Sequence, residues 1–560
     1  ASYTPVHRYP SFYGLPAEFG LKFNFNYNLV DAPASFEDSF FAFLASNATP
    51  VARTLYQDQY NAQTNSLLDV TQNHNIPAVK VEEWLAQNAG GLVDTTRYTI
   101  FFINWWGRSD FKFHVYRKND DPDPDTQSPF GTRSSRALTA WGGTAANDAE
   151  SGNGALRRIW FHDLSAGPEF WTDNWNVDTA DLDGNGKTDY RMPPIWEYGS
   201  PKPTYRPFNS LSRDLGLIAR FVAIDLLFTT SPLYKPAISA PKLPGGIQLD
   251  VHVWQGDRTA DGKSFYRAPY AATKLSPLQP YHSFSSTVAD GPLTGRALDV
   301  YGCFLSPVSC YGNRLFGISF GDLFLYHGDH LNQFIEGDAP YELPVFLYNT
   351  TDALGGGGLL GFADDNWRDG TQSFVFGFLS PLLRNAGFGF TSTVVHEAGH
   401  HLGMSHPHDG YDSELNLDFF NADSFYFANY GDESSTVMSY LSIENDFGQF
   451  DRDNMNRYMT VHFINQANAI LASIYKSPRA GNASATLQAA DTSAAAALSA
   501  YQTMNYAGSV VSAKDAYQKV LAAAAEANVK VEPQSYTADY RSKGASSKFV
   551  DRVDYKRLAP

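Results

Sequence analysis

The chain has 560 residues, which is too long for one ordinary hydrophobic core, so we expect about three domains. Hydrophobic residues make up 43% of the sequence and charged residues only 18%, which excludes a largely disordered chain. The formal net charge of -17 argues against nucleic acid or an anionic membrane as partner, because either would require a basic patch. We therefore expect a protein or peptide substrate.

The sequence also indicates the cellular compartment in which the protein works. No apolar run approaches the roughly 20 residues of a membrane span, so none is expected. The chain begins at Ala1 without a charged and then apolar leader, as a mature secreted protein does, although a trimmed chain would begin in the same way. Cys303 and Cys310 are the only cysteines, and a small disulfide loop and two idle thiols are equal alternatives. We expect a secreted or extracellular protein.

The first 200 residues mix helical and strand patterns. Residues 36–44 predict a helix, and residues 99–103 and 111–116 predict strands. We expect an α/β accessory domain over residues 1–200. Residues 120–125 read Asp-Asp-Pro-Asp-Pro-Asp, which breaks both helix and strand, so we expect a surface loop whose acidity serves solvation.

A second acidic segment in this domain has the spacing of a calcium loop. Oxygen donors stand at positions one, three, five, seven and nine of the loop, and Gly186 allows its tight turn. Position twelve is Met192 rather than Glu, so the loop is not an EF-hand, and Glu197 is a candidate for the bidentate ligand. An acidic turn capped by its own side chains is the alternative. The calcium ligands we expect are Asp181, Asp183, Asn185, Lys187 (through its carbonyl) and Asp189.

The next region begins at a Pro-rich linker, residues 201–203, and its order of elements predicts a sheet backed by helices over residues 201–475. After residue 475 the sequence becomes Ala-rich and predicts a helical hairpin within residues 476–560. The predicted strands are 247–254, 343–348 and 373–379, and the predicted helices are 217–228, 392–402, 489–503 and 512–527.

One motif in this region carries chemistry. His396 and His400 are four residues apart, so on a helix they present two imidazoles to one metal, with Glu397 beside them. Gly403 permits a sharp turn after the helix, which brings His406 back as a third ligand. Three neutral imidazoles and an open fourth position suit zinc, whereas calcium and magnesium prefer oxygen ligands.

The chemistry expected of such a centre is hydrolysis. Glu397 would take a proton from a water that the metal activates, and then pass it to the leaving amine. The alternative, that these are surface or core histidines brought together by chance, requires all five fixed positions to coincide. His401 projects about 100° away from His400 on the helix, so we expect a supporting or surface role for it.

The pattern His396-Glu397-x-x-His400-x-x-Gly403-x-x-His406 resembles the signature of the metzincin metallopeptidases. Residues 435–440, Ser-Thr-Val-Met-Ser-Tyr, resemble the Met-turn of that family, and with Pro407 they are most similar to its serralysin branch. The resemblance implies that Met438 forms an apolar floor under the metal. It also implies that Tyr440 stabilises the oxyanion of the reaction. No glycine-aspartate repeat array follows, so calcium dependence and secretion route are not carried over.

We therefore expect an α+β, multidomain protein. A metzincin-like catalytic domain, with a mixed sheet and a zinc helix, would stand between the α/β accessory domain and the helical hairpin. The expected function is that of a secreted zinc endopeptidase. The alternatives are a secreted structural or adhesive protein that retains the metzincin scaffold, and hydrolysis of a non-peptide amide by the same centre.

Overall fold

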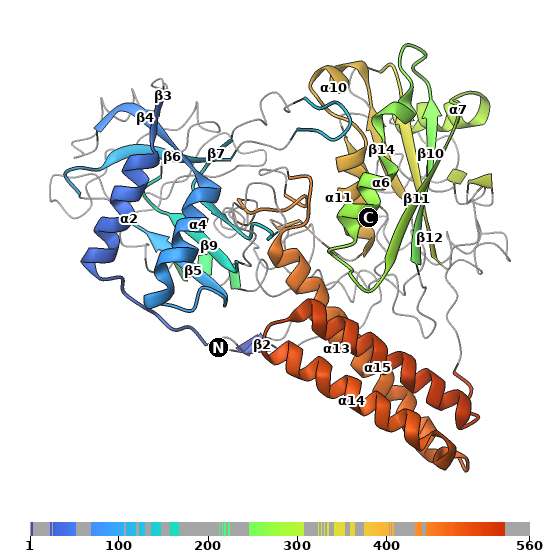
Figure 1. Cartoon of the computed structure of the whole chain (residues 1–560). Helices are drawn as coiled ribbons and strands as arrows, with labels where there is room; N and C mark the ends of the chain where they lie inside the picture. Colours follow the sequence, from blue (N-terminus) through green and yellow to red (C-terminus); the bar gives the residue numbers. More distant parts are fainter. Residues whose placement is uncertain are drawn as a thin grey trace.

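The computed structural model contains both helices and mixed sheets, distributed over several regions, so the fold is α+β and multidomain. Figure 1 shows a sheet-rich N-terminal region in blue to cyan, a central sheet in green and yellow, and long C-terminal helices in orange and red. The structure describes residues 2–3, 23–24, 26–51, 69–105, 108–118, 122–128, 136–146, 157–166, 212, 215–216, 218–219, 222–223, 246–306, 323, 326–327, 330, 333–334, 341–352, 359–363, 374–402, 404, 406–407, 431, 433–439 and 444–531.

The N-terminal region, residues 26–166, is built on two sheets, with strand orders β3-β4-β6-β7 and β5-β9-β8. The predicted helix at 36–44 and the strands at 99–103 and 111–116 are confirmed as α2, β5 and β6. Tyr116, Trp141 and Phe161 are fully buried in a core of its own. The elements are α2 (Ala34–Asn47), β3 (Thr49–Val51), β4 (Asp69–Pro77), α4 (Ala78–Asn88), β5 (Thr99–Ile103), β6 (Lys112–Lys118), β7 (Arg136–Leu138), β8 (Ala140–Gly142) and β9 (Ile159–Asp163); a short pair, β1 (Ser2–Tyr3) and β2 (Phe23–Asn24), precedes them.

The central region, residues 246–439, is a five-stranded mixed sheet in the order β11-β10-β12-β14-β13. Its pairings are parallel except for the edge strand β13, which is antiparallel to β14. The predicted strands at 247–254, 343–348 and 373–379 are confirmed. The strands are β10 (Gly246–Gln255), β11 (Ser283–Pro292), β12 (Tyr341–Asn349), β13 (Gly361–Ala363) and β14 (Val375–Leu379).

Helices cover both faces of this sheet because successive side chains of a strand point to opposite faces. On β12, Val345 lies in the core that also contains residues of α6 and α11, whereas Phe346 lies in the core that contains residues of α7. The helix predicted at 392–402 is confirmed as α11. The helices are α6 (Ala268–Leu275), α7 (Gly295–Phe304), α10 (Pro381–Asn385) and α11 (Thr391–Leu402).

The helical region, residues 449–531, contains the two predicted C-terminal helices, but they do not form an isolated hairpin. They pack with a third helix of 28 residues, and the three share a continuous hydrophobic core with the central sheet. Small buried residues on the hairpin, such as Ala490, Ala497 and Ala513, permit this close approach. None of the described helices is long and apolar enough to cross a membrane. The helices are α13 (Gln449–Lys476), α14 (Ser484–Gln502) and α15 (Tyr506–Glu526).

Candidate metal centre

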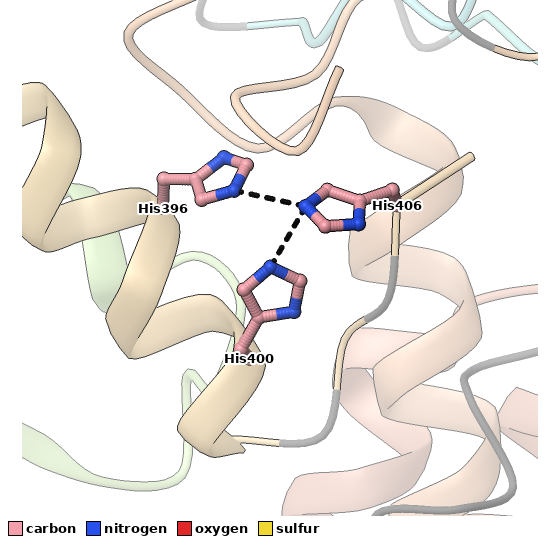
Figure 2. A group of neighbouring side chains, drawn as sticks. All are labelled: His396, His400 and His406. Carbon is pink, nitrogen blue, oxygen red and sulfur yellow. Dashed lines mark hydrogen bonds between the residues drawn. The ribbon is translucent and has the colours of Figure 1, made fainter. Parts of the chain in front are cut away.

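The three predicted histidine ligands lie together. His396 and His400 project from successive turns of α11, and His406 faces them from the segment that follows (Figure 2). The Nε2 atom of His406 lies 3.2 Å from that of His396 and 3.0 Å from that of His400. Among the residues that the structure describes, these are the only three His, Cys, Asp or Glu side chains whose ligand atoms all lie within 4.8 Å of one another.

Backbone carbonyls set the tautomer of two of these rings. The Nδ1 atom of His396 lies 2.7 Å from the Val437 carbonyl oxygen, and that of His400 lies 3.0 Å from the Met404 carbonyl oxygen. A carbonyl only accepts, so each Nδ1 carries the proton and donates it. The Nε2 lone pairs of both rings therefore point toward His406, which is the arrangement that metal-ligating histidines adopt.

The spacing of the nitrogen atoms fits a small tetrahedral ion. Zinc–nitrogen bonds of about 2.0–2.1 Å at tetrahedral angles separate the nitrogens by about 3.3 Å. The two Nε2 separations given above are close to this value. His400 and His406 are 5% and 6% exposed, so a bound ion would be shielded from bulk water while His396 remains partly accessible. These residues fit a zinc ion.

Glu397 lies on the same helix and is 6% exposed. Its position relative to the edge strand follows from Gly361 on β13, where a Cβ atom would lie 2.9 Å from the Glu397 Oε1 atom. The carboxylate therefore lies against the edge strand of the sheet. A side chain at position 361 would push against it.

Met438 packs against α11, the helix that carries His396 and His400. Its side chain is fully buried, and its sulfur would lie 2.7 Å from a Cβ atom placed on Gly399 of α11. Only a glycine at position 399 leaves room for both the sulfur and the ring of Phe447, which would lie 2.9 Å from the same atom. Residues 435–439 thus pack directly against the helix that carries two of the ligands.

His401 is not at the surface. It is fully buried, and burial lowers its pKa to about 3, so it is an uncharged side chain in the protein interior. Of the two roles predicted for His401, the surface position is therefore wrong, and the supporting role stays a prediction. The reason is that α11 is covered on this side as well, since Leu402 beside it is also buried.

The acidic side chains of the 122–128 loop are buried, so the prediction that they serve solvation is wrong. Asp123 is fully buried and the side chain of Asp125 is 0% exposed, so their charges do not serve solvation. Both carboxylates accept hydrogen bonds from the start of α11, including one of 2.8 Å from the Thr391 N–H to Asp125. No sequence signal could have revealed this contact, because 266 residues separate its partners.

Several predicted site residues lie outside the described part of the chain. They are Tyr440, Gly403 and the calcium ligands Asp181, Asp183, Asn185, Lys187 and Asp189, together with Met192 and Glu197. The linker at 201–203 and most of the predicted helix 217–228 lie outside it as well. Cys303 is disulfide-bonded, and Cys310, the only other cysteine of the chain, is not among the described residues.

No protein-family model and no curated protein matches this chain.

Proposed function

We propose that the chain is a secreted zinc endopeptidase of the metzincin type. The observation that carries the proposal is the convergence of the three Nε2 atoms of His396, His400 and His406, at separations suited to a tetrahedral zinc. The mixed sheet with its antiparallel edge strand, and the helix α11 above it, support a metzincin-type fold.

The residues of the site have separate roles in this proposal. When bound, zinc lowers the pKa of a coordinated water and polarises a carbonyl oxygen. Glu397 accepts the proton of the attacking water and returns it to the leaving amine. Met438 supports the ring positions from below. Tyr440, in the part of the chain not described, donates a hydrogen bond to the carbonyl oxygen under attack.

The position of β13 favours a peptide over other amides as substrate. In the described sheet β13 is an edge strand, so one side of its backbone offers hydrogen-bonding groups to an added strand. Gly361 of this strand lies against the Glu397 carboxylate. An extended peptide that pairs with β13 would therefore pass beside the proposed base, which a small amide has no reason to do.

The decisive experiment replaces Glu397 by Gln, which keeps the shape of the side chain and removes the base. We expect peptide cleavage to fall by at least about 100-fold, because general-base catalysis contributes about 10²–10⁴. Zinc content, measured by metal analysis of the purified protein, should remain near one ion per chain because the three histidines are intact. A chelator should abolish the activity of the wild type, and added zinc should restore it.

The control is Glu37→Gln, which removes the same charge from an exposed position on α2. It should cleave peptides at the wild-type rate. A scaffold protein without activity would bind zinc yet cleave no member of a peptide library, whereas an amidase would hydrolyse small acyl amides only. Undiminished cleavage by Glu397→Gln would refute the proposed mechanism.

A further inference from the structure

The N-terminal region contacts the metal centre at two places. One is the 122–128 loop, which Figure 1 shows in cyan extending toward α10 and α11. The other is the β7–β8 connection around Thr139, which contacts the segment that leads to Met438. We propose that these two contacts make the N-terminal region a positioning element for the metal ligands, rather than a separate accessory module; this inference rests on the proposed zinc function.

The first contact fixes the start of α11. The Asp125 carboxylate accepts the Thr391 N–H at 2.8 Å and the Thr391 hydroxyl at 2.6 Å, so it caps the first turn from a distant part of the chain. Asp123 accepts the Gly389 N–H at 3.2 Å. Only glycine fits at position 389, because a Cβ atom there would lie 2.2 Å from the Asp125 Oδ2 atom.

The loop is itself held in shape. The other oxygen of Asp123 accepts the N–H groups of Asp125 and Thr126, each at 2.9 Å. The Thr126 hydroxyl donates to the Gly387 carbonyl at 2.8 Å, just before the helix. The loop therefore presents a preformed acceptor to α11, and little conformational entropy is lost when the cap forms.

The second contact fixes the other half of the site. The buried Glu433 carboxylate accepts the Thr139 N–H at 2.6 Å and also the Ala140 N–H. Two residues further on, the Ser435 N–H donates to the Gly142 carbonyl at 2.9 Å. The same segment then supplies the Val437 carbonyl that orients His396.

These hydrogen bonds position the metal-binding helix more sharply than the apolar core does. Val394, Val395 and Ala398 bury one face of α11, but hydrophobic contact is non-directional and sets the position of the helix along its axis less sharply than a hydrogen bond does. The hydrogen bonds of Thr391 fix the position of α11 along its axis. Those of Glu433 fix the segment that carries the Val437 carbonyl, which faces His396. The imidazoles then meet at the spacing that zinc requires, so the site is organised before the ion binds.

The test measures zinc affinity in the full chain by competition with a chromophoric chelator, well below the melting temperature. Asp125→Ala should weaken zinc binding by about 3- to 30-fold, the factor that loss of an N-cap represents. Asp125→Asn should stay within about twofold of the wild type, because the amide oxygen still accepts from Thr391. Burial also raises the pKa of Asp125 to about 7, so a neutral side chain of this shape is a close substitute.

The matched control is Asn505→Ala, which removes the N-cap of α15, where Asn505 accepts the Gly508 N–H at 3.1 Å. It should lower the melting temperature as Asp125→Ala does, yet leave zinc affinity unchanged. The absorption spectrum of the cobalt-substituted protein should shift in Asp125→Ala and not in Asn505→Ala, because it reports the geometry of the ligands. The milder Thr391→Val loses the 2.6 Å hydrogen bond to Asp125 and the one that the Thr391 hydroxyl accepts from the Arg267 N–H, and it should weaken zinc binding in the same direction.

The outcomes separate this inference from the proposed function. If Asp125→Ala and Thr391→Val bind zinc as tightly as the wild type, with the same cobalt spectrum, the loop is only structural and the inference is wrong. If the wild type itself binds no zinc, the proposed function fails. Should Asp125→Ala not fold, Thr391→Val decides the question by the same two measurements, zinc affinity and the cobalt spectrum.

Discussion

Gly399 shows how one residue joins the metal helix to the floor of the site. It lies on α11 next to His400, and its missing side chain admits the Met438 sulfur and the Phe447 ring to the helix backbone. Glycine inside a helix costs about 1 kcal/mol relative to alanine, so its presence here has a packing reason. The close approach of Met438 is that reason.

We predict that Gly399→Ala lowers the free energy of unfolding by about 1–3 kcal/mol, because the added methyl group overpacks the core beneath the ligands. The measurement is urea denaturation followed by tryptophan fluorescence. The control is Gly302→Ala on α7, where no atom lies within 4 Å of the new Cβ. That variant should gain up to about 1 kcal/mol. Equal effects of the two substitutions would contradict the packing argument.

At the scale of elements, α11 combines two faces. Val394 and Ala398 face the core of the central sheet, while His396 and His400 face His406. The period of the helix separates these faces, so the same 12 residues both anchor the element and present its ligands. The calcium loop is the second element to which we assign a metal, and it stays a prediction from sequence.

Calcium should stabilise the protein by mass action if residues 181–189 bind it. With zinc kept saturating, millimolar calcium should raise the melting temperature of the wild type by about 2 °C or more, since 1 kcal/mol corresponds to about 2–4 °C in domains of this size. Asp183→Ala should remove the shift, as measured by differential scanning calorimetry. Magnesium is the control ion, because it demands a stricter octahedral geometry. A shift that persists in Asp183→Ala would place the calcium elsewhere.

At the scale of the whole molecule, the N-terminal region and the helical region meet at a buried cluster of charged and aromatic side chains. Arg158 of the N-terminal region lies 2.5 Å from Asp453 of α13 and donates to the Met504 carbonyl at 2.8 Å, just before α15. Tyr98 also donates to Asp453, at 2.7 Å. A cavity of about 800 Å³ adjoins this cluster, and none of the three histidines lines it. These contacts hold the N-terminal region and the helical region together.

We predict that Asp453→Ala costs about 3–5 kcal/mol of stability, because it leaves the buried Arg158 guanidinium without its carboxylate. Urea denaturation measures the loss. The control is Asp94→Ala, which breaks an ion pair between Asp94 and Arg97. The two side chains are 55% and 72% exposed, so the loss of this pair should change stability little. A small effect of Asp453→Ala would mean that water or a neighbouring group compensates Arg158.

The amino-acid sequence by itself determined the local features. The spacing of His396, Glu397 and His400 specifies one helix face, and the helix α11 and the strands of the central sheet lie where their patterns predict. These features depend on residues within one or two turns of each other, and periodicity records such neighbours directly. The zinc identity and the peptidase activity remain predictions of the same local motif.

Only the tertiary structure decided the contacts between distant segments. The tautomer of His396 depends on a carbonyl 41 residues away, and the cap of α11 depends on Asp125, 266 residues before Thr391. The burial of His401 and the packing of the C-terminal hairpin on α13 are of the same kind. An Asp in a Pro-rich loop has the same local pattern whether it faces water or caps a helix. Its role is settled by what the fold brings against it.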